Sequence, residues 1–272
     1  MGTSSWSSKD WIGVFYPAGT RAADMLPFYA TCFNAVEADV TYYRIPSESM
    51  IRGWRDRTPD GFKITAKFPR EVVHGGSNRV PDGTRVLKPD TVGDITLRFL
   101  ERMAGLKERC GPLVIQMPYY NRSVFAENEC FFHRLTEFLE WLPGGFEYSV
   151  EIRNRQFLGP ELASILRQHR IPLVQVDIPY MPGPGHWGGP DHLLTGDFIY
   201  LRLIGDRNAV EKATDRFDRI VLDRSAQLRA WAMWLNSIRS GVRNIYVFAN
   251  NHFAGHGPAT IREFMRWYRG GD

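Results

Sequence analysis

Eight short apolar or alternating runs recur along the 272 residues, and helix-like segments separate most of them. The runs are Gly2–Ser4, Val36–Thr41, Phe62–Lys67, Leu113–Met117, Tyr148–Arg153, Leu173–Asp177, Phe198–Leu203 and Asn244–Ala249. Strands that alternate with helices pair in parallel through right-handed crossovers, which predicts an α/β fold. Eight such units match the size of a (β/α)8 barrel of the TIM type. We therefore expect a single TIM-type barrel domain over residues 1–272.

The alternation within these runs distinguishes a closed barrel from an open, doubly wound sheet. Central strands of an open sheet have helices on both faces and are apolar nearly throughout. Here the fifth run sets Val150 and Ile152 against Glu151 and Arg153, and five other runs alternate in the same way. Because successive strand residues point to opposite faces, one face is apolar and the other is polar. In a barrel, helices cover the apolar face and the polar face lines the interior.

Two long connections interrupt the regular pattern. Ile178–Asp197 contains four prolines and five glycines and predicts a loop in place of the sixth crossover helix. Phe68–Asp90 is a long basic segment after the third strand and is also predicted to be a loop. Both follow a strand, so we expect both at the C-terminal mouth, where enzymes of this fold have their active sites. Capping signals predict regular helices after Ser47 and from Pro160.

Composition excludes several classes of protein. Seventeen Phe, eleven Tyr and eight Trp are too many for a disordered chain. No apolar run approaches the roughly 18 residues of a membrane-spanning helix, so we expect no membrane association. Cys32, Cys110 and Cys130 are an odd, widely spaced set, which favours reduced thiols in a cytoplasmic protein. The net charge of +4 permits an anionic partner without requiring one.

Polar and charged residues gather on the inward face near the strand ends. They are Glu37, Asp39, Lys67, Gln116, Glu151, Arg153, Asp177, Arg202, Asn250 and Asn251. A purely structural barrel would fill this layer with Val, Ile and Leu, because a buried charge is costly unless it is paired. We expect a ligand site here. An ion-pair network that plugs the barrel is the alternative.

Three carboxylates are the candidate catalytic residues: Glu37, Glu151 and Asp177. Carboxylates a few ångströms apart raise one pKa and so provide an acid and a base. The same oxygens suit one divalent cation such as magnesium or manganese, and spacing does not choose between these uses. Basic residues would bind phosphate, sulfate or carboxylate. The candidate substrate-binding residues are Lys67, Gln116, Arg153, Tyr200, Arg202, Asn250, Asn251, His74 and Trp6.

The residues therefore favour an enzyme that acts on a small anionic substrate, whether phosphorylated, sugar-like or nucleotide-like. Its chemistry would be carboxylate acid/base catalysis or catalysis assisted by a divalent metal. The alternative is a non-catalytic nucleic-acid-binding protein that uses the basic loop 68–90, with an affinity that falls steeply as salt rises. Mouth aromatics would support either ligand by stacking: Trp6, Trp11, Tyr42, Tyr43, Tyr119, Tyr120 and Trp187.

The ordered motifs of the chain resemble the YecE-like family, catalogued as domain of unknown function 72. The resemblance rests on Gly2–Trp6 with Trp11 and Phe15–Pro17, Val36–Glu37 with Thr41–Tyr43, Phe62 with Lys67, Gln116–Pro118, Glu151 with Arg153, Asp177, Tyr200 with Arg202, and Asn250–His252. It implies a TIM barrel of the broad type shared with xylose isomerases and endonuclease-IV-like enzymes. It implies no reaction, because the family has no agreed one.

The chain departs from the family pattern at four positions. Ile204 and Asn154 stand where the family often has histidines, Asp39 replaces a common Asn, and Phe157 replaces a common Trp. The loss of two histidines weakens the case for a metal cluster of the endonuclease IV type.

Overall fold

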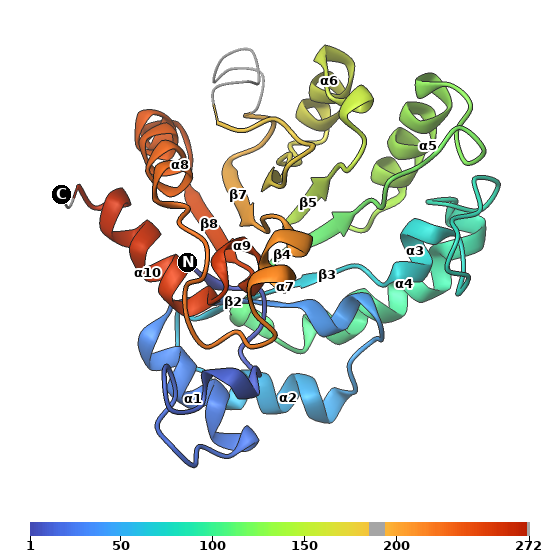
Figure 1. Cartoon of the computed structure of the whole chain (residues 1–272). Coiled ribbons are helices and arrows are strands. Elements are labelled where there is room, and N and C mark those ends of the chain that lie inside the picture. The colour runs from blue at the N-terminus through green and yellow to red at the C-terminus, as the bar shows by residue number, and fades with distance from the viewer. Residues whose placement is uncertain (185–193, 271–272) are drawn as a thin grey trace.

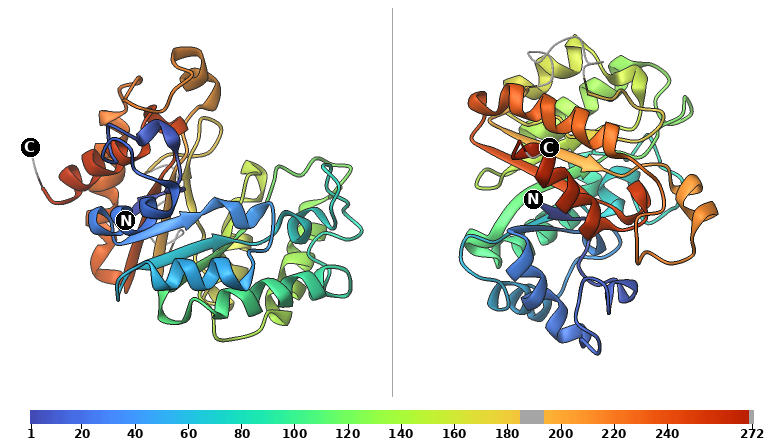
Figure 2. Two further views of the ribbon diagram at one scale, coloured as in Figure 1. Left: turned by 90° about the horizontal axis from the view of Figure 1, so that it is seen from below. Right: turned by 60° about the vertical axis from the view of Figure 1, so that its left-hand side comes forward.

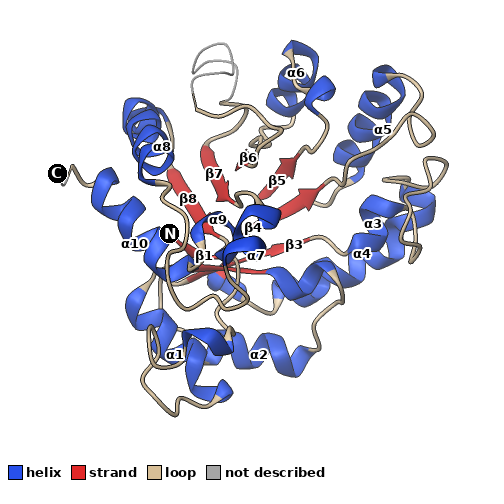
Figure 3. Cartoon of the chain, in the orientation of Figure 1, coloured by secondary structure: helices blue, strands red, loops and turns tan. Residues whose placement is uncertain are grey.

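The computed structural model describes residues 1–184 and 194–270, and its strands lie at the centre of surrounding helices (Figures 1 and 3). Each of the eight predicted runs contains a strand, although in the second run the strand ends at Ala38 and the last three residues belong to a 3₁₀ helix. The strands in the described chain are β1 (Gly2–Thr3), β2 (Ala35–Ala38), β3 (Lys63–Lys67), β4 (Cys110–Gln116), β5 (Tyr148–Glu151), β6 (Gln175–Asp177), β7 (Phe198–Leu203) and β8 (Asn244–Ala249).

These strands form two parallel four-stranded sheets, ordered β1-β8-β7-β6 and β2-β3-β4-β5. An isolated parallel bridge between Val150 and Leu173 joins β5 to the segment just before β6. There the Val150 amide donates to the Pro172 carbonyl at 3.0 Å, and the Val174 amide donates to the Val150 carbonyl at 2.8 Å. The sheets thus meet along one edge in a barrel-like arrangement (Figure 2).

A side chain mediates the contact between β1 and β2. The buried hydroxyl of Tyr29 accepts a hydrogen bond from the Thr3 amide at 2.7 Å and donates to the Ala35 carbonyl at 3.3 Å. A Cβ atom on Gly2 would lie only 1.9 Å from that carbonyl oxygen, so the approach requires glycine. One phenol therefore satisfies backbone groups of both strands.

Helices surround the strands in the order expected from the sequence. They are α1 (Ala22–Cys32), α2 (Glu48–Asp56), α3 (Arg70–His74), α4 (Pro89–Ala104), α5 (Asn128–Trp141), α6 (Pro160–Gln168), α7 (Arg207–Ala213), α8 (Ser225–Ile238), α9 (Asn251–Ala254) and α10 (Gly257–Tyr268). Ser47 caps α2 by accepting from the Met50 amide, and Pro160 begins α6, as predicted. Among the described helices, none has the length and apolar character needed to cross a membrane.

The two long connections differ in how far they agree with prediction. The segment Phe68–Asp90 is not a continuous loop, because it contains α3 and its last two residues begin α4. In the sixth crossover, residues 178–184 and 194–197 form no helix, whereas residues 185–193 lie outside the described chain. A further 3₁₀ helix, η2 (Asp39–Tyr42), directly follows β2 and turns the chain at the C-terminal end of that strand.

The inward face of the strands has two layers. The lower layer, toward the N-terminal ends of the strands, is mostly apolar. It contains the buried Ser149, in register with Val114, and a hydrophobic cluster of Ala35, Val114, Val174, Phe198, Tyr200, Tyr246 and Phe248. Two residues farther along three of these strands, the same face carries Glu37, Gln116 and Arg202. The charged part of the predicted polar interior therefore lies at the C-terminal end of the strands, which we call the mouth.

Candidate functional site

Arg202 of β7 lies at the centre of the mouth and is 2% exposed. Its Nη1 donates to Glu151 Oε2 at 2.5 Å and to Gln116 Oε1 at 2.8 Å. Its Nη2 and Nε donate to Glu37 Oε1 at 2.8 and 3.2 Å. Both glutamates are completely buried, so Arg202 supplies the compensating charge that each needs in a low-dielectric interior.

The second oxygen of Glu37 is also occupied. The Tyr200 hydroxyl donates to Glu37 Oε2 at 2.7 Å, and the Thr65 hydroxyl lies 2.8 Å from the Tyr200 hydroxyl. Tyr200 precedes Arg202 by two residues on β7, so one strand face delivers both donors to the same carboxylate. Glu37 is therefore held on both oxygens.

A third carboxylate, Asp39, is more accessible. It is the first residue of η2, and its side chain is 30% exposed, whereas the side chain of Glu37 is fully buried. Lys67 Nζ lies 2.5 Å from Asp39 Oδ1 and 3.8 Å from Glu37 Oε1. The alternation of the second strand predicts Asp39 on the inward face, two residues after Glu37, but its residue type alone assigns it no role.

The pKa values of these neighbouring carboxyl groups diverge. Burial acts to raise the pKa of Glu37, but the charges of Arg202 and Lys67 outweigh burial and lower it. Burial also acts to raise the pKa of Glu151, and the Arg153 and Arg202 charges lower it. Although the Asp39 side chain is partly exposed, its Oδ1 is buried. This burial outweighs the attraction of Lys67 and, with repulsion from Glu37, raises the pKa of Asp39 to about 6. The two glutamates stay ionised at neutral pH while Asp39 titrates near it.

Arg153 extends the network toward solvent. Its Nε lies 2.5 Å from Glu151 Oε1, and its side chain is 15% exposed. The charges of Arg70 and Arg153 both act on Tyr42, whose hydroxyl lies 3.3 Å from His74 Nε2. This contact places His74 at the edge of the mouth.

The structure does not bring Asp177 into this network. Asp177 Oδ2 accepts a hydrogen bond from the Trp231 indole of α8 at 2.6 Å. Burial raises the pKa of Asp177, and the Trp231 hydrogen bond and the Arg224 charge partly oppose this. The expectation that Asp177 lies a few ångströms from Glu37 and Glu151 is therefore wrong, because β6 turns its other face inward. Asp177 is in register with Leu203, on the side that the helices cover, whereas Val174, one residue before β6, lies in the inward layer.

Three other predicted binding residues hold loops together. Asn250 caps α9 and accepts from the His252 amide at 3.0 Å. Asn251 accepts from the Trp11 indole at 3.2 Å and from the Gly257 amide at 2.8 Å. Trp6 packs edge-to-face on Trp54, with ring centroids 5.4 Å apart. The predicted binding residues that do meet in the Arg202 network are Lys67, Gln116, Arg153, Tyr200 and Arg202.

The donor set does not fit a divalent cation. Arg202 lies between Glu37 and Glu151 and occupies oxygens that a metal would need, and Asp177 points elsewhere. Within residues 1–184 and 194–270, no group of three or more His, Cys, Asp or Glu side chains is placed to hold a metal.

The predicted nucleic-acid surface is only partly accessible. Arg79, Arg85 and Lys88 of the basic segment are exposed. Of the mouth aromatics, Tyr43 and Tyr119 are 77% and 62% exposed. Trp11 and Tyr120 are buried in the core, Tyr42 and Trp6 are half-buried, and Trp187 lies outside the described residues.

Known proteins share both sequence and fold with this chain. YecE proteins from two Escherichia coli strains, K12 and O157:H7, each described as a UPF0759 protein, are 32% identical over 157 residues, or 58% of this chain. The chain spans about half the length of these curated relatives, since the match covers 49% of each.

Solved structures share the fold. A DUF72 family protein from Thermotoga maritima is 24% identical with a TM-score of 0.69, and the match covers 98% of both chains. One from Enterococcus faecalis is 18% identical with a TM-score of 0.71, covering 100% of this chain and 95% of that one. D-psicose 3-epimerase from Clostridium cellulolyticum, solved with D-tagatose, has a TM-score of 0.57 at 11% identity, covering 100% and 92%. The family described as "Protein of unknown function DUF72" matches residues 1–270, and the chain belongs to it.

Proposed function

We propose that the two sheets close into one (β/α)8 barrel whose mouth binds a small anionic substrate, and that Asp39 exchanges a proton with that substrate. The proposal rests on one contrast within the network. Asp39 is the partly exposed carboxylate, whereas the side chains of Glu37 and Glu151 are fully buried and engaged by Arg202. An enzyme of this design performs acid/base chemistry without a metal ligand set.

The neighbouring carboxylates Glu37 and Asp39 have different roles in this proposal. Glu37 remains an anion and helps to keep the pKa of Asp39 elevated. A general acid or base is most effective when its pKa lies near the working pH, and environments that push two pKa values apart identify the pair. Lys67 lies against both carboxylates and stabilises Asp39 whenever it has lost its proton.

Arg153 is the proposed anion-binding group. Glu151 bonds to its Nε and fixes the side chain, while the partly exposed remainder of the guanidinium retains donors for a ligand oxygen. The substrate anion would then lie at the rim near Tyr42 and His74, and its reacting atom would lie over Asp39. Glu37 and Glu151 are positioning residues in this arrangement, because they hold the cations.

The first experiment is a thermal-shift screen of phosphorylated sugars, nucleotides and carboxylic acids, each beside its uncharged parent compound. Sugars are included because the D-psicose 3-epimerase, similar in fold alone, was solved with a sugar. We expect protection by a charged compound that its parent does not reproduce. We expect Arg153→Gln to weaken that binding by about tenfold or more, since a hydrogen bond to a charged group contributes about 1.5–3 kcal/mol.

Asp39→Asn tests the proton transfer on the ligand so identified. Turnover followed by NMR should fall by roughly 10²–10⁴-fold with little change in KM, and the wild-type rate should depend on a group with an apparent pKa near 6. Asp94→Asn on the exposed face of α4 is the matched control and should keep full activity. Full turnover by Asp39→Asn, or a charge-independent ligand profile, would contradict the proposal.

A further inference from the structure

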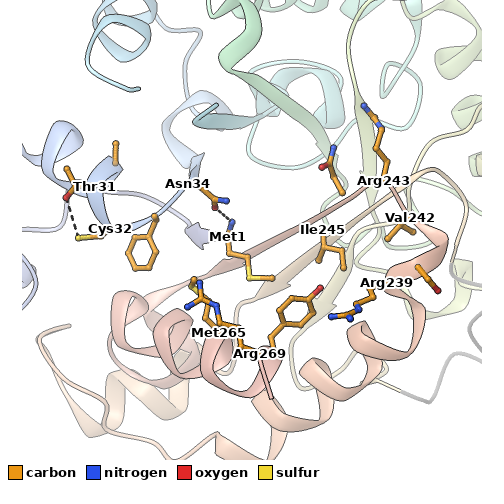
Figure 4. A pocket seen from close by; sticks show the side chains of 15 residues that line it. Met1, Thr31, Cys32, Asn34, Arg239, Val242, Arg243, Ile245, Met265 and Arg269 are labelled. Atoms are coloured by element: carbon orange, nitrogen blue, oxygen red, sulfur yellow. Dashed lines mark hydrogen bonds between the residues drawn. The ribbon is translucent and has the colours of Figure 1, made fainter. Parts of the chain in front are cut away.

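We infer that a second site, a basic groove at the opposite end of the molecule from the mouth, binds the phosphodiester backbone of a nucleic acid. The groove, which we call the rear groove, consists of two cavities of about 890 and 620 Å³. Both are lined by the C-terminal ends of α1 and α10, and the larger one continues to the end of α8 (Figure 4). They share Cys32, Phe33, Met265 and Arg269, so they form one continuous depression.

The charge of the rear groove has one sign. Its described lining contains five arginines, Arg239, Arg243, Arg262, Arg266 and Arg269, and no aspartate or glutamate. A lining of this kind attracts anions from a distance and raises their local concentration. The mouth differs, because its three cations each meet a carboxylate.

Most of these arginines carry a positive charge that no carboxylate of the described chain neutralises. Arg243 is paired with Glu147 and Asp197. Arg262 lies over the Phe15 ring at 5.2 Å, and Arg266 lies over the Trp267 ring at 5.4 Å, contacts that orient a guanidinium without neutralising it. In the described part of the chain, no carboxylate lies within ion-pair distance of Arg239 or Arg269.

The spatial distribution of the arginines favours a chain-like ligand over a compact anion. Arg262, Arg266 and Arg269 follow the spacing of one α10 face, so they form a row along the helix. Arg239 and Arg243 continue the row from the end of α8 to the start of β8, and Figure 4 shows Arg239, Arg243 and Arg269 spread along the cavity. A small anion is bound by donors that converge on one point, whereas a phosphodiester backbone presents successive charges to a row.

The test uses fluorescence anisotropy with labelled oligothymidylate and oligouridylate of about 20 nucleotides, longer than common single-strand sites. We expect the wild-type protein to bind, with affinity falling steeply between about 50 and 200 mM salt. The triple variant Arg239→Gln, Arg266→Gln, Arg269→Gln should lose at least about tenfold in affinity. Its salt slope should fall by about 2, since each single-strand phosphate contact contributes about 0.7.

A charge-matched control is available on the other basic surface. Arg79→Gln, Arg85→Gln, Lys88→Gln removes the same charge from the segment Phe68–Asp90 and should leave affinity within about twofold. Asp39→Asn should also bind normally, which separates this inference from the proposed function. Equal denaturation midpoints for the two triple variants would exclude a folding defect. Absent binding by the wild type, an equal loss in both triple variants, or equally tight binding of inorganic tripolyphosphate would overturn the inference.

Discussion

The two ends of the molecule use positive charge in opposite ways. At the mouth, Lys67, Arg153 and Arg202 each contact a carboxylate, and the group is buried or nearly so. In the rear groove, Arg239 and Arg269 are exposed and the described lining contains no carboxylate. The difference separates two electrostatic tasks. Paired buried charges set local pKa values and geometry, whereas unpaired exposed charges act at long range and respond to salt.

The largest effect on stability is expected from a substitution at the centre of the mouth network. Arg202→Met removes the cation that two buried glutamates share and leaves Glu37 with only the more distant Lys67. The free energy of unfolding should therefore fall by about 3–5 kcal/mol. Chemical denaturation measures it, and Arg269→Met in the rear groove is the matched control. Adding Glu37→Gln and Glu151→Gln to Arg202→Met should restore part of the loss, because the uncompensated charges then disappear. If the single Arg202→Met variant were as stable as the wild type, the buried glutamates would not need Arg202 as their counter-charge.

The next-largest effect is on the pH dependence of stability, and it concerns His256 at the start of α10, the helix that connects the mouth end to the rear groove. His256 caps the first turn of α10, with Nδ1 accepting from the Ala259 amide, and burial lowers its pKa to about 4. The unfolded chain therefore binds a proton below about pH 6.5 that the folded chain resists, so stability falls from pH 6.5 to about 4, by roughly 3 kcal/mol. His256→Asn should flatten that part of the stability profile. His133→Asn, at an exposed position, should leave it unchanged.

A smaller effect on stability is expected from removing one uncharged hydrogen-bond donor, the Tyr200 hydroxyl. Tyr200→Phe removes the hydroxyl that donates to Glu37 and should cost about 2 kcal/mol of stability. Because this donor lowers the pKa of Glu37, its loss should also move the acid-induced loss of stability to a higher pH. Tyr246→Phe is the control in the same interior layer, since no hydrogen bond of its hydroxyl is found among the described residues. Equal costs for the two variants would assign the effect to ring packing.

The smallest expected effect is in the rear groove. Arg239→Gln alone should change the free energy of unfolding by no more than about 0.5 kcal/mol, because the side chain is exposed and has no carboxylate partner among the described residues. Thermal denaturation at low and high salt checks this. A loss of more than about 1 kcal/mol would mean that the arginine stabilises the end of α8, and the contrast between the two ends would need revision.

Strand alternation made most of the mouth predictable, since Glu37, Lys67, Gln116, Glu151 and Arg202 share one face of their strands. The same alternation predicts Asp177 on the inward face, and this is wrong. At β6 the inward face carries Val174 and Val176, the latter in register with Arg202, so Asp177 lies on the outer face and meets Trp231 of α8. The division into two sheets depends on individual backbone bonds at the edges. The rear groove joins helix ends that are distant in sequence, so only the folded chain displays it.

The placement of the network across the two sheets has a consequence for how the protein opens. Glu37, Gln116 and Glu151 belong to the sheet β2–β5, whereas Tyr200 and Arg202 belong to the other sheet. Each sheet has its own ladder of backbone bonds. The backbone bonds around Val150 join the sheets at one edge, and side chains such as Tyr29 and Arg202 join them elsewhere. In native-state hydrogen exchange, the sheets should therefore behave as two cooperative units that open together while Arg202 is paired, and separately once it is not.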